Sequence, residues 1–73
     1  MKNGKTTVAE YDTRLKRRNS VKLIIECLVN VREAEQNYLE NVPENFQNSE
    51  SFEIGECAVD ALDEIIGLLA EVY

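Results

Sequence analysis

The chain has 73 residues, of which 44% are hydrophobic and 30% charged, and its formal net charge is −6. A chain of this length forms one domain at most, and its composition is that of a folded protein rather than a disordered one. Its longest apolar runs fall far short of the roughly 18 residues that a membrane span needs, and no signal-peptide segment follows the first lysines, so we expect a cytoplasmic protein without a membrane partner.

The charges are divided unevenly along the chain. Residues 1–22 hold seven of the eight basic residues and two acids, whereas residues 23–73 hold one basic residue, Arg32, and twelve acids. Such a division predicts a basic patch, an acidic surface that meets a partner, or both.

A first helix is predicted over residues 13–40. Its apolar residues recur at helical steps of three and four, which gives a stripe of Val21, Ile24, Leu28 and Val31 that continues to Tyr38. Residues 1–12 are expected to be flexible or to form a short N-terminal element, and residues 13–73 to form a single helical domain.

The beginning of this helix has two candidate positions. Asp12 or Thr13 would cap a helix that runs continuously to residue 40, whereas Asn19 or Ser20 would cap a shorter one. We favour the continuous helix.

The connection between the helices is predicted to span residues 41–49. Asn41 tolerates the left-handed conformation that often ends a helix, and Pro43 blocks simple continuation while favouring one short helical turn after it. Phe46 is expected to cover the end of the core.

The second helix, over residues 50–72, has the clearest pattern in the sequence. Its apolar stripe has strict steps of four and three and is widened by two leucines; the residues are Ile54, Ala58, Ala61, Leu62, Ile65, Leu68, Leu69 and Val72. Ser49 is a suitable N-cap, and Glu50 and Glu53 suit the positive end of the helix dipole.

Two helices with so short a connection should form an antiparallel hairpin. If residue 40 lies beside residue 50, then Cys27 lies near Asp63 and residues 16–18 lie near Tyr73. The two cysteines, Cys27 and Cys57, are then too far apart for a disulfide, so we expect free thiols.

A single hairpin leaves part of its apolar surface in water. Pairing two hairpins into a four-helix bundle through the two stripes would cover it, so we expect a homodimer. The alternative is that the N-terminal segment folds back as a third element of the same chain.

The connection also carries a resemblance. The stretch from Glu35 to Ile65 resembles a family of short acidic bacterial and phage proteins that have the pattern N-x-P-E-x-x-Q-x-S-E between two helices. The matching residues are Asn41, Pro43, Glu44, Gln47, Ser49, Glu50, Glu53, Glu56, Asp60, Leu62 and Ile65. The resemblance implies a helical hairpin, and it implies no activity.

The basic run of the first helix is a candidate binding patch, formed by Arg14, Lys16, Arg17, Arg18 and Lys22. On a helix, residues 14, 18 and 22 share a side and could face a phosphate backbone together, as in a nucleic-acid-associated regulator or an antitoxin-like protein. One alternative is a separate acidic protein partner. The interpretation that we favour places these cations beside the acidic C-terminal end of the second helix or beside the acidic face of a dimer partner.

The acidic side of the second helix is a candidate face for a basic partner, formed by Glu53, Glu56, Asp60, Asp63 and Glu64. It could serve an inhibitor that imitates nucleic acid, but a face that is simply solvated is the simpler interpretation. Without histidine, a phosphate-binding loop or a nucleophile motif, the sequence predicts a protein that is not an enzyme and takes no metal or cofactor.

Overall fold

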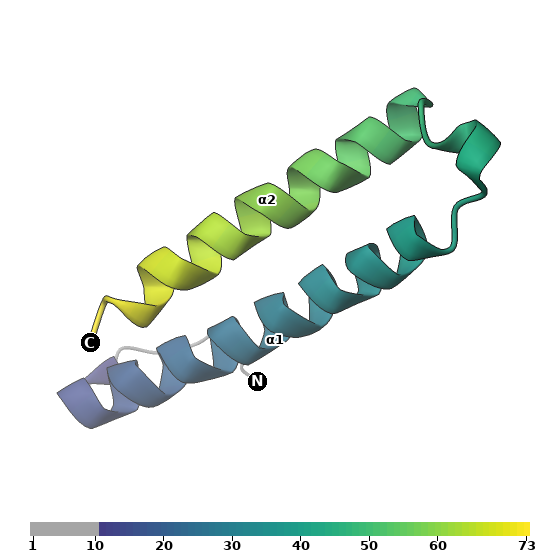
Figure 1. Cartoon of the computed structure of the whole chain (residues 1–73). Helices are drawn as coiled ribbons and strands as arrows, with labels where there is room; N and C mark the ends of the chain where they lie inside the picture. The colour runs from purple at the N-terminus through teal and green to yellow at the C-terminus, as the bar shows by residue number, and fades with distance from the viewer. Residues whose placement is uncertain (1–10) are drawn as a thin grey trace, which may run out of the picture.

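The computed structural model describes residues 11–73, and over this range the chain is an all-α antiparallel hairpin of two helices (Figure 1). Helix α1 spans Arg14–Glu40, a short 3-10 turn η2 spans Glu44–Phe46, and helix α2 spans Glu50–Ala70. The predicted hairpin is confirmed. The short element expected within residues 1–12 lies almost wholly outside the described residues.

Helix α1 begins at the first of the two candidate caps. The backbone of Thr13 is extended, and its hydroxyl accepts a hydrogen bond of 3.1 Å from the backbone N–H of Lys16. This bond satisfies one of the N–H groups that the first turn of a helix leaves without a partner. The helix then continues without a break through Asn19 and Ser20 for 27 residues, so the prediction of a continuous helix is confirmed.

The connection differs from its prediction in two details. Asn41 ends α1 with a φ of −100°, which is outside the left-handed region; its side-chain amide donates to the carbonyl of Asn37 at 2.8 Å instead. Pro43 precedes the predicted short turn, which is η2. Phe46 does not cover the core, because 56% of its surface is exposed. Phe52, half-buried in the first turn of α2, lies at that end of the helix pair.

Helix α2 begins and ends close to the expected positions. The hydroxyl of Ser49 accepts a 3.2 Å bond from the N–H of Phe52, and Glu50 and Glu53 lie in the first turn. The last helical residue is Ala70, and Val72 lies in a terminal turn where its N–H donates to the carbonyl of Leu69.

The register of the two helices is about one helical turn away from the predicted one. Arg32 contacts Asp63, and Leu39 packs against Gly55. Residue 27 is therefore about level with residue 67 rather than with Asp63, and the prediction was wrong by about four residues. The cause is the connection, since η2 carries the chain past the end of α1 and the first turn of α2 overhangs it (Figure 1).

The buried core of the hairpin is small and lies near the connection. Among residues 11–73 the buried hydrophobic side chains are Leu39, with 6% of its surface exposed, and Val59, with 7%. Gly55 of α2, one helical turn before Val59, is buried as well. A Cβ atom at Gly55 would lie 2.5 Å from Oε2 of Glu35 and 2.7 Å from Cδ2 of Leu39, so the missing side chain allows the helices to approach closely there.

The two glycines of α2 offer a matched test of this close approach. We expect Gly55→Leu to lower the free energy of unfolding by about 1–3 kcal/mol, because the new side chain must displace Leu39 from a filled site. Gly67→Leu should instead raise the free energy of unfolding by about 1 kcal/mol, because leucine favours a helix more than glycine does. A Cβ atom at Gly67 meets nothing within 4 Å, so no clash opposes this gain. Urea denaturation followed by circular dichroism measures both, and shifts of the same sign would contradict the close approach.

Candidate interaction surfaces

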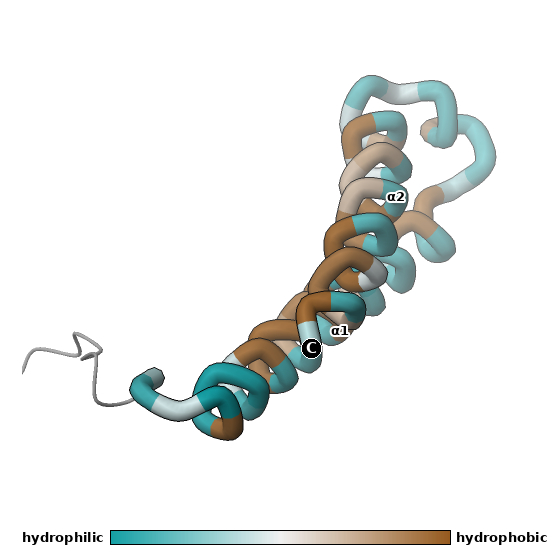
Figure 2. The backbone as a smooth tube through the Cα atoms, turned by 90° about the vertical axis from the view of Figure 1, so that its left-hand side faces the viewer, coloured by the Kyte–Doolittle hydropathy of each residue, from teal (hydrophilic) through white to brown (hydrophobic). Residues whose placement is uncertain are grey.

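The helices contact each other through a stripe on each that includes polar residues. On each helix one regular series of positions is partly or fully covered. On α1 it consists of Val21, Ile25, Leu28, Arg32, Glu35 and Leu39, and on α2 of Phe52, Gly55, Val59, Leu62, Ile66 and Leu69. Both series have alternating steps of three and four residues, which is the spacing of one helix face. Figure 2 shows the hydrophobic residues running along the length of both helices.

The predicted stripes are only partly the stripes that make this contact. Val21, Leu28, Ala58, Leu62 and Leu69 are half-covered within the hairpin. The other predicted stripe residues are exposed: Ile24, Val31, Ile54, Ala61, Ile65, Leu68 and Val72. Each helix has a wider apolar arc than one neighbour can cover, so part of each predicted stripe packs within the hairpin and part remains exposed.

The exposed apolar residues of the two helices lie on the same side of the hairpin. On α1, Ile24, Val31 and Tyr38 each come one residue before a covered position, and on α2, Ile54, Ala61, Ile65 and Leu68 do the same. One residue turns the side chain by about 100° around the axis. Each exposed series is therefore rotated by about 100° from the contact between the helices, in the same direction when each helix is viewed from its own N-terminus. Because the two helices run antiparallel, these two rotations bring both exposed series to the same side of the hairpin.

We call this surface the apolar face, and it consists of Ile24, Val31, Tyr38, Ile54, Ala61, Ile65, Leu68 and Val72. Apart from Ala61, these side chains expose between 44% and 62% of their surface. Monomeric soluble proteins rarely expose contiguous apolar patches larger than a few hundred Å². The apolar face is therefore the strongest candidate interaction surface of the described residues.

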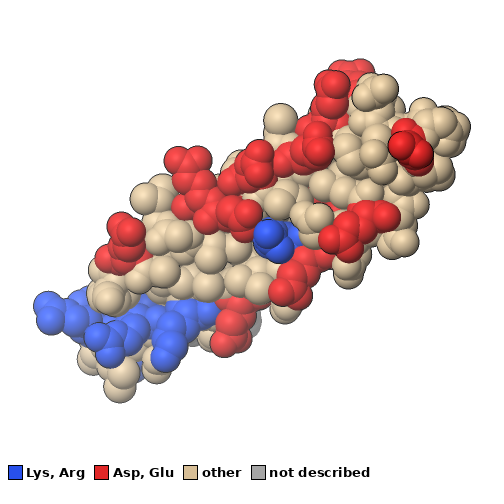
Figure 3. Space-filling model, viewed as in Figure 1, with Lys and Arg blue, Asp and Glu red and all other residues tan. Residues whose placement is uncertain are grey.

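The opposite side of the hairpin is polar, and Figure 3 shows acidic side chains of both helices on it. There Nε of Arg32 donates to Oδ1 of Asp63 at 2.7 Å. This hydrogen bond, and then the attraction of the Asp63 charge, raise the pKa of Arg32 above its ordinary value. Both side chains remain substantially exposed, so the pair marks the register of the two helices but adds little stability.

The acidic residues predicted to face a basic partner, Glu53, Glu56, Asp60, Asp63 and Glu64, are all exposed on α2. Asp63 is engaged by Arg32. No group of three His, Cys, Asp or Glu side chains within residues 11–73 is placed to hold a metal ion.

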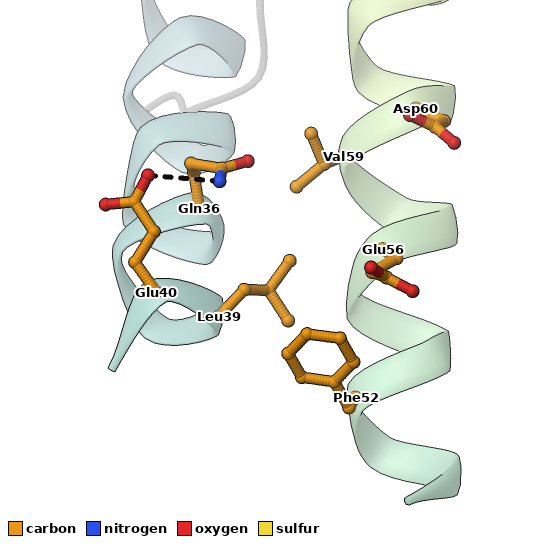
Figure 4. Close-up of a pocket in the computed structure, with 7 residues that line it drawn as sticks. All are labelled: Gln36, Leu39, Glu40, Phe52, Glu56, Val59 and Asp60. Carbon is orange, nitrogen blue, oxygen red and sulfur yellow. Dashed lines mark hydrogen bonds between the residues drawn. The ribbon is translucent and has the colours of Figure 1, made fainter. Parts of the chain in front are cut away.

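An open groove of about 450 Å³ lies on this polar side near the connection. Figure 4 shows Leu39, Val59 and Phe52 pointing into the space between the helices, while Asp60 points away from α1. On α1, the amide of Gln36 donates to Glu40 at 3.2 Å. The groove thus has an apolar floor and an acidic rim, which is formed by Glu40, Glu56 and Asp60.

The basic residues gather at the other end of the hairpin (Figure 3). Lys16 forms an ion pair of 3.1 Å with Asp12, and Arg17 donates to the backbone carbonyl of Tyr11 at 2.7 Å. Arg18 and Lys22 line a second groove, of about 270 Å³, together with Tyr73.

The first turns of α1 extend beyond the C-terminal end of α2 (Figure 1). Only Arg18 of residues 16–18 therefore borders the groove that contains Tyr73, which corrects the prediction that all three lie beside it. Among residues 11–73, Arg14, Arg18 and Lys22 form no ion pair. Arg18 and Lys22 thus lie beside the C-terminal end of α2, as the sequence favoured, but the carboxylates of α2 form no ion pair with them within residues 11–73.

Two features of the surface could be read only in part from the sequence. Cys27 and Cys57 are free, as predicted, but both are exposed, which their position in apolar-rich helical stretches did not indicate. The sequence predicts that Tyr38 ends the first stripe. Tyr38 belongs to the apolar face because the adjacent series, which contains Leu39, is the one that contacts α2. The signal for that choice is Gly55, which marks the place where a second helix comes closest.

Comparison of the chain with protein-family models, with curated proteins and with solved structures gives no match. Neither α1 nor α2 has the length of apolar sequence that a membrane crossing requires.

Proposed function

We propose that the chain is a non-enzymatic protein–protein interaction module that acts as a homodimer. In this proposal the apolar faces of two hairpins pack against each other and form a four-helix bundle. The observation that carries the proposal is the exposure of the apolar face, which includes large side chains on both helices.

The size of the core gives independent support. Full burial of a large apolar side chain contributes roughly 1.5–3 kcal/mol, and only Leu39 and Val59 are buried hydrophobics within residues 11–73. Ordering each residue costs about 1–2 kcal/mol of conformational entropy. A hairpin with so small a core therefore needs further apolar burial, and a second copy supplies it with the same residues.

Light scattering coupled to size-exclusion chromatography tests the proposal directly. At micromolar concentration we expect a mass of twice the 8.3 kDa of one chain. A monomer of 8.3 kDa with protected core amides would overturn the proposal, because the hairpin would then be stable with its apolar face in water.

A second candidate function is contact with nucleic acid through the basic end of α1. It is favoured by the three cations, Arg14, Arg18 and Lys22, that form no ion pair among the described residues. Their spacing of four residues places them along one side of the helix, where they could face successive phosphates.

A mobility-shift series across salt concentration tests this candidate. If the three cations contact phosphates, replacing all of them with glutamate should remove about 2.7 from the slope of log affinity against log salt on duplex DNA. No binding by the unmodified chain at low salt, or equal slopes for both chains, would exclude the candidate.

A further inference from the structure

The two ends of the hairpin carry opposite charge. Because residue 27 is about level with residue 67, the described chain divides into an open end, residues 11–27 and 67–73, and a loop end, residues 28–66. The open end has five basic side chains and three acidic ones, a formal net charge of +2. The loop end has one basic side chain, Arg32, and ten acidic ones, a formal net charge of −9.

The apolar face is nearly symmetrical about its own middle. On α1, Ile24 and Tyr38 each lie seven residues from Val31. In the second half of the hairpin, Ile54 of α2 and Val72 of the turn that follows α2 each lie nine residues from position 63. Position 63 is about level with Val31, since Asp63 contacts the neighbouring Arg32. A copy turned end for end therefore covers the same apolar residues as a copy laid in the same direction.

Charge then decides between the two directions. Two copies laid in the same direction would bring the two loop ends together, each with a net charge of −9. Packed helices lie about 8–10 Å apart, and the screening length at physiological salt is about 8 Å. Many of the loop-end carboxylates lie on the polar sides of the two hairpins, away from the contact, so salt screens much of this repulsion and the preference for one direction is strongest at low salt.

We infer that two copies of this chain pair end for end, with the open end of each hairpin beside the loop end of its partner. This inference rests on the proposed homodimer and adds its direction. The twofold axis crosses the hairpins at the level of Val31, and α1 of one copy runs antiparallel to α1 of the other. The basic segment that extends beyond α2 then lies beside the acidic connection of the partner.

The distance between the two connections tests the inference. The variant Asn48→Cys, made with Cys27→Ala and Cys57→Ala, carries one spin label on the exposed connection of each copy. End-for-end pairing should give a label-to-label distance of about 40 Å, which is the length of the 27-residue α1 at about 1.5 Å per residue. Pairing in the same direction should give less than about 20 Å, or two helix widths.

The result distinguishes failure of the direction from failure of the dimer. A mass of two chains with a distance below about 20 Å would overturn the inference and leave the homodimer standing, whereas a mass of one chain would overturn both. As a control, a label at Asn30, near the middle of the hairpin, should report a distance well below 40 Å in a dimer of either direction.

A charge variant tests whether the charges of the two ends set the direction of pairing. Arg14→Glu, Arg18→Glu and Lys22→Glu together change the open end from +2 to −4 without altering any residue of the apolar face. The dimer should persist, and a population with the short distance should appear beside the long one. An unchanged distance distribution would show that the ends do not set the direction through their charge.

Discussion

Ile65→Glu should convert the proposed dimer into a monomer. Ile65 lies on the apolar face with 44% of its surface exposed in the hairpin, so the substitution removes little from the contact between α1 and α2. In a symmetrical dimer it would bury two carboxylates without partners close to the twofold axis. Each such charge costs several kcal/mol, and at about 1.4 kcal/mol per factor of ten the dimer should weaken by at least about 10³-fold.

Sedimentation equilibrium measures this change against a matched control. Asn37→Glu adds the same charge on the side of α1 that points away from α2, and it should leave the mass at two chains. A dimer that tolerates Ile65→Glu as well as it tolerates Asn37→Glu would mean that the apolar face is not the contact between copies.

Leu39→Ala should be the most damaging single truncation within the hairpin. Leu39 is the most buried hydrophobic of residues 11–73 and packs against Gly55 at the closest approach of the helices. Removing a buried leucine side chain costs about 2–5 kcal/mol. A core in a chain of this size supplies only about 3–5 kcal/mol, so most of the protein should unfold.

Thermal denaturation followed by circular dichroism shows the effect. The matched control is Leu23→Ala, because Leu23 is 62% exposed and is not part of the apolar face. The control should change the free energy of unfolding by less than about 0.5 kcal/mol. Similar melting temperatures for the two variants would contradict a core centred on Leu39.

The helices and their beginnings were predictable because they depend on short stretches of sequence. Thr13 and Ser49 cap the helices as expected, since a hydroxyl beside the first turn is sufficient. The turn after Pro43 was predictable for the same reason. These features require no information from the other helix.

The choice of contacting stripe was not predictable from periodicity. In α2 the exposed series that includes Ile54 and the covered series that includes Gly55 both have steps of three and four, and the exposed series is the more hydrophobic. Gly55 has no apolar side chain, yet it is covered because it allows Leu39 to pack closely. Arg32 also occupies a covered position, since its stem can lie against the helix while its charged end reaches Asp63.

The register of the helices, and the residues that lie beside the basic segment, depend on which stripe of each helix makes the contact. A connection of nine residues permits several registers that differ by about one turn. The structure takes the one that aligns Leu39 with Gly55 and Arg32 with Asp63, and this carries the first turns of α1 past the end of α2. The overhang places Arg14 beyond the end of α2, whereas Arg18 and Lys22 border the last residues of α2 without forming an ion pair within residues 11–73.

The close approach at Gly55 also has a consequence for the order in which the hairpin forms and opens. Leu39 and Gly55 are separated by only 16 residues along the chain, and loops of about 10 residues close within about 10–100 ns. Contacts beyond Val59 join residues of greater separation, and among residues 11–73 they involve no buried hydrophobic side chain. The hairpin should therefore zip from its connection toward its termini, and its amide hydrogens should exchange with solvent most readily at the open end.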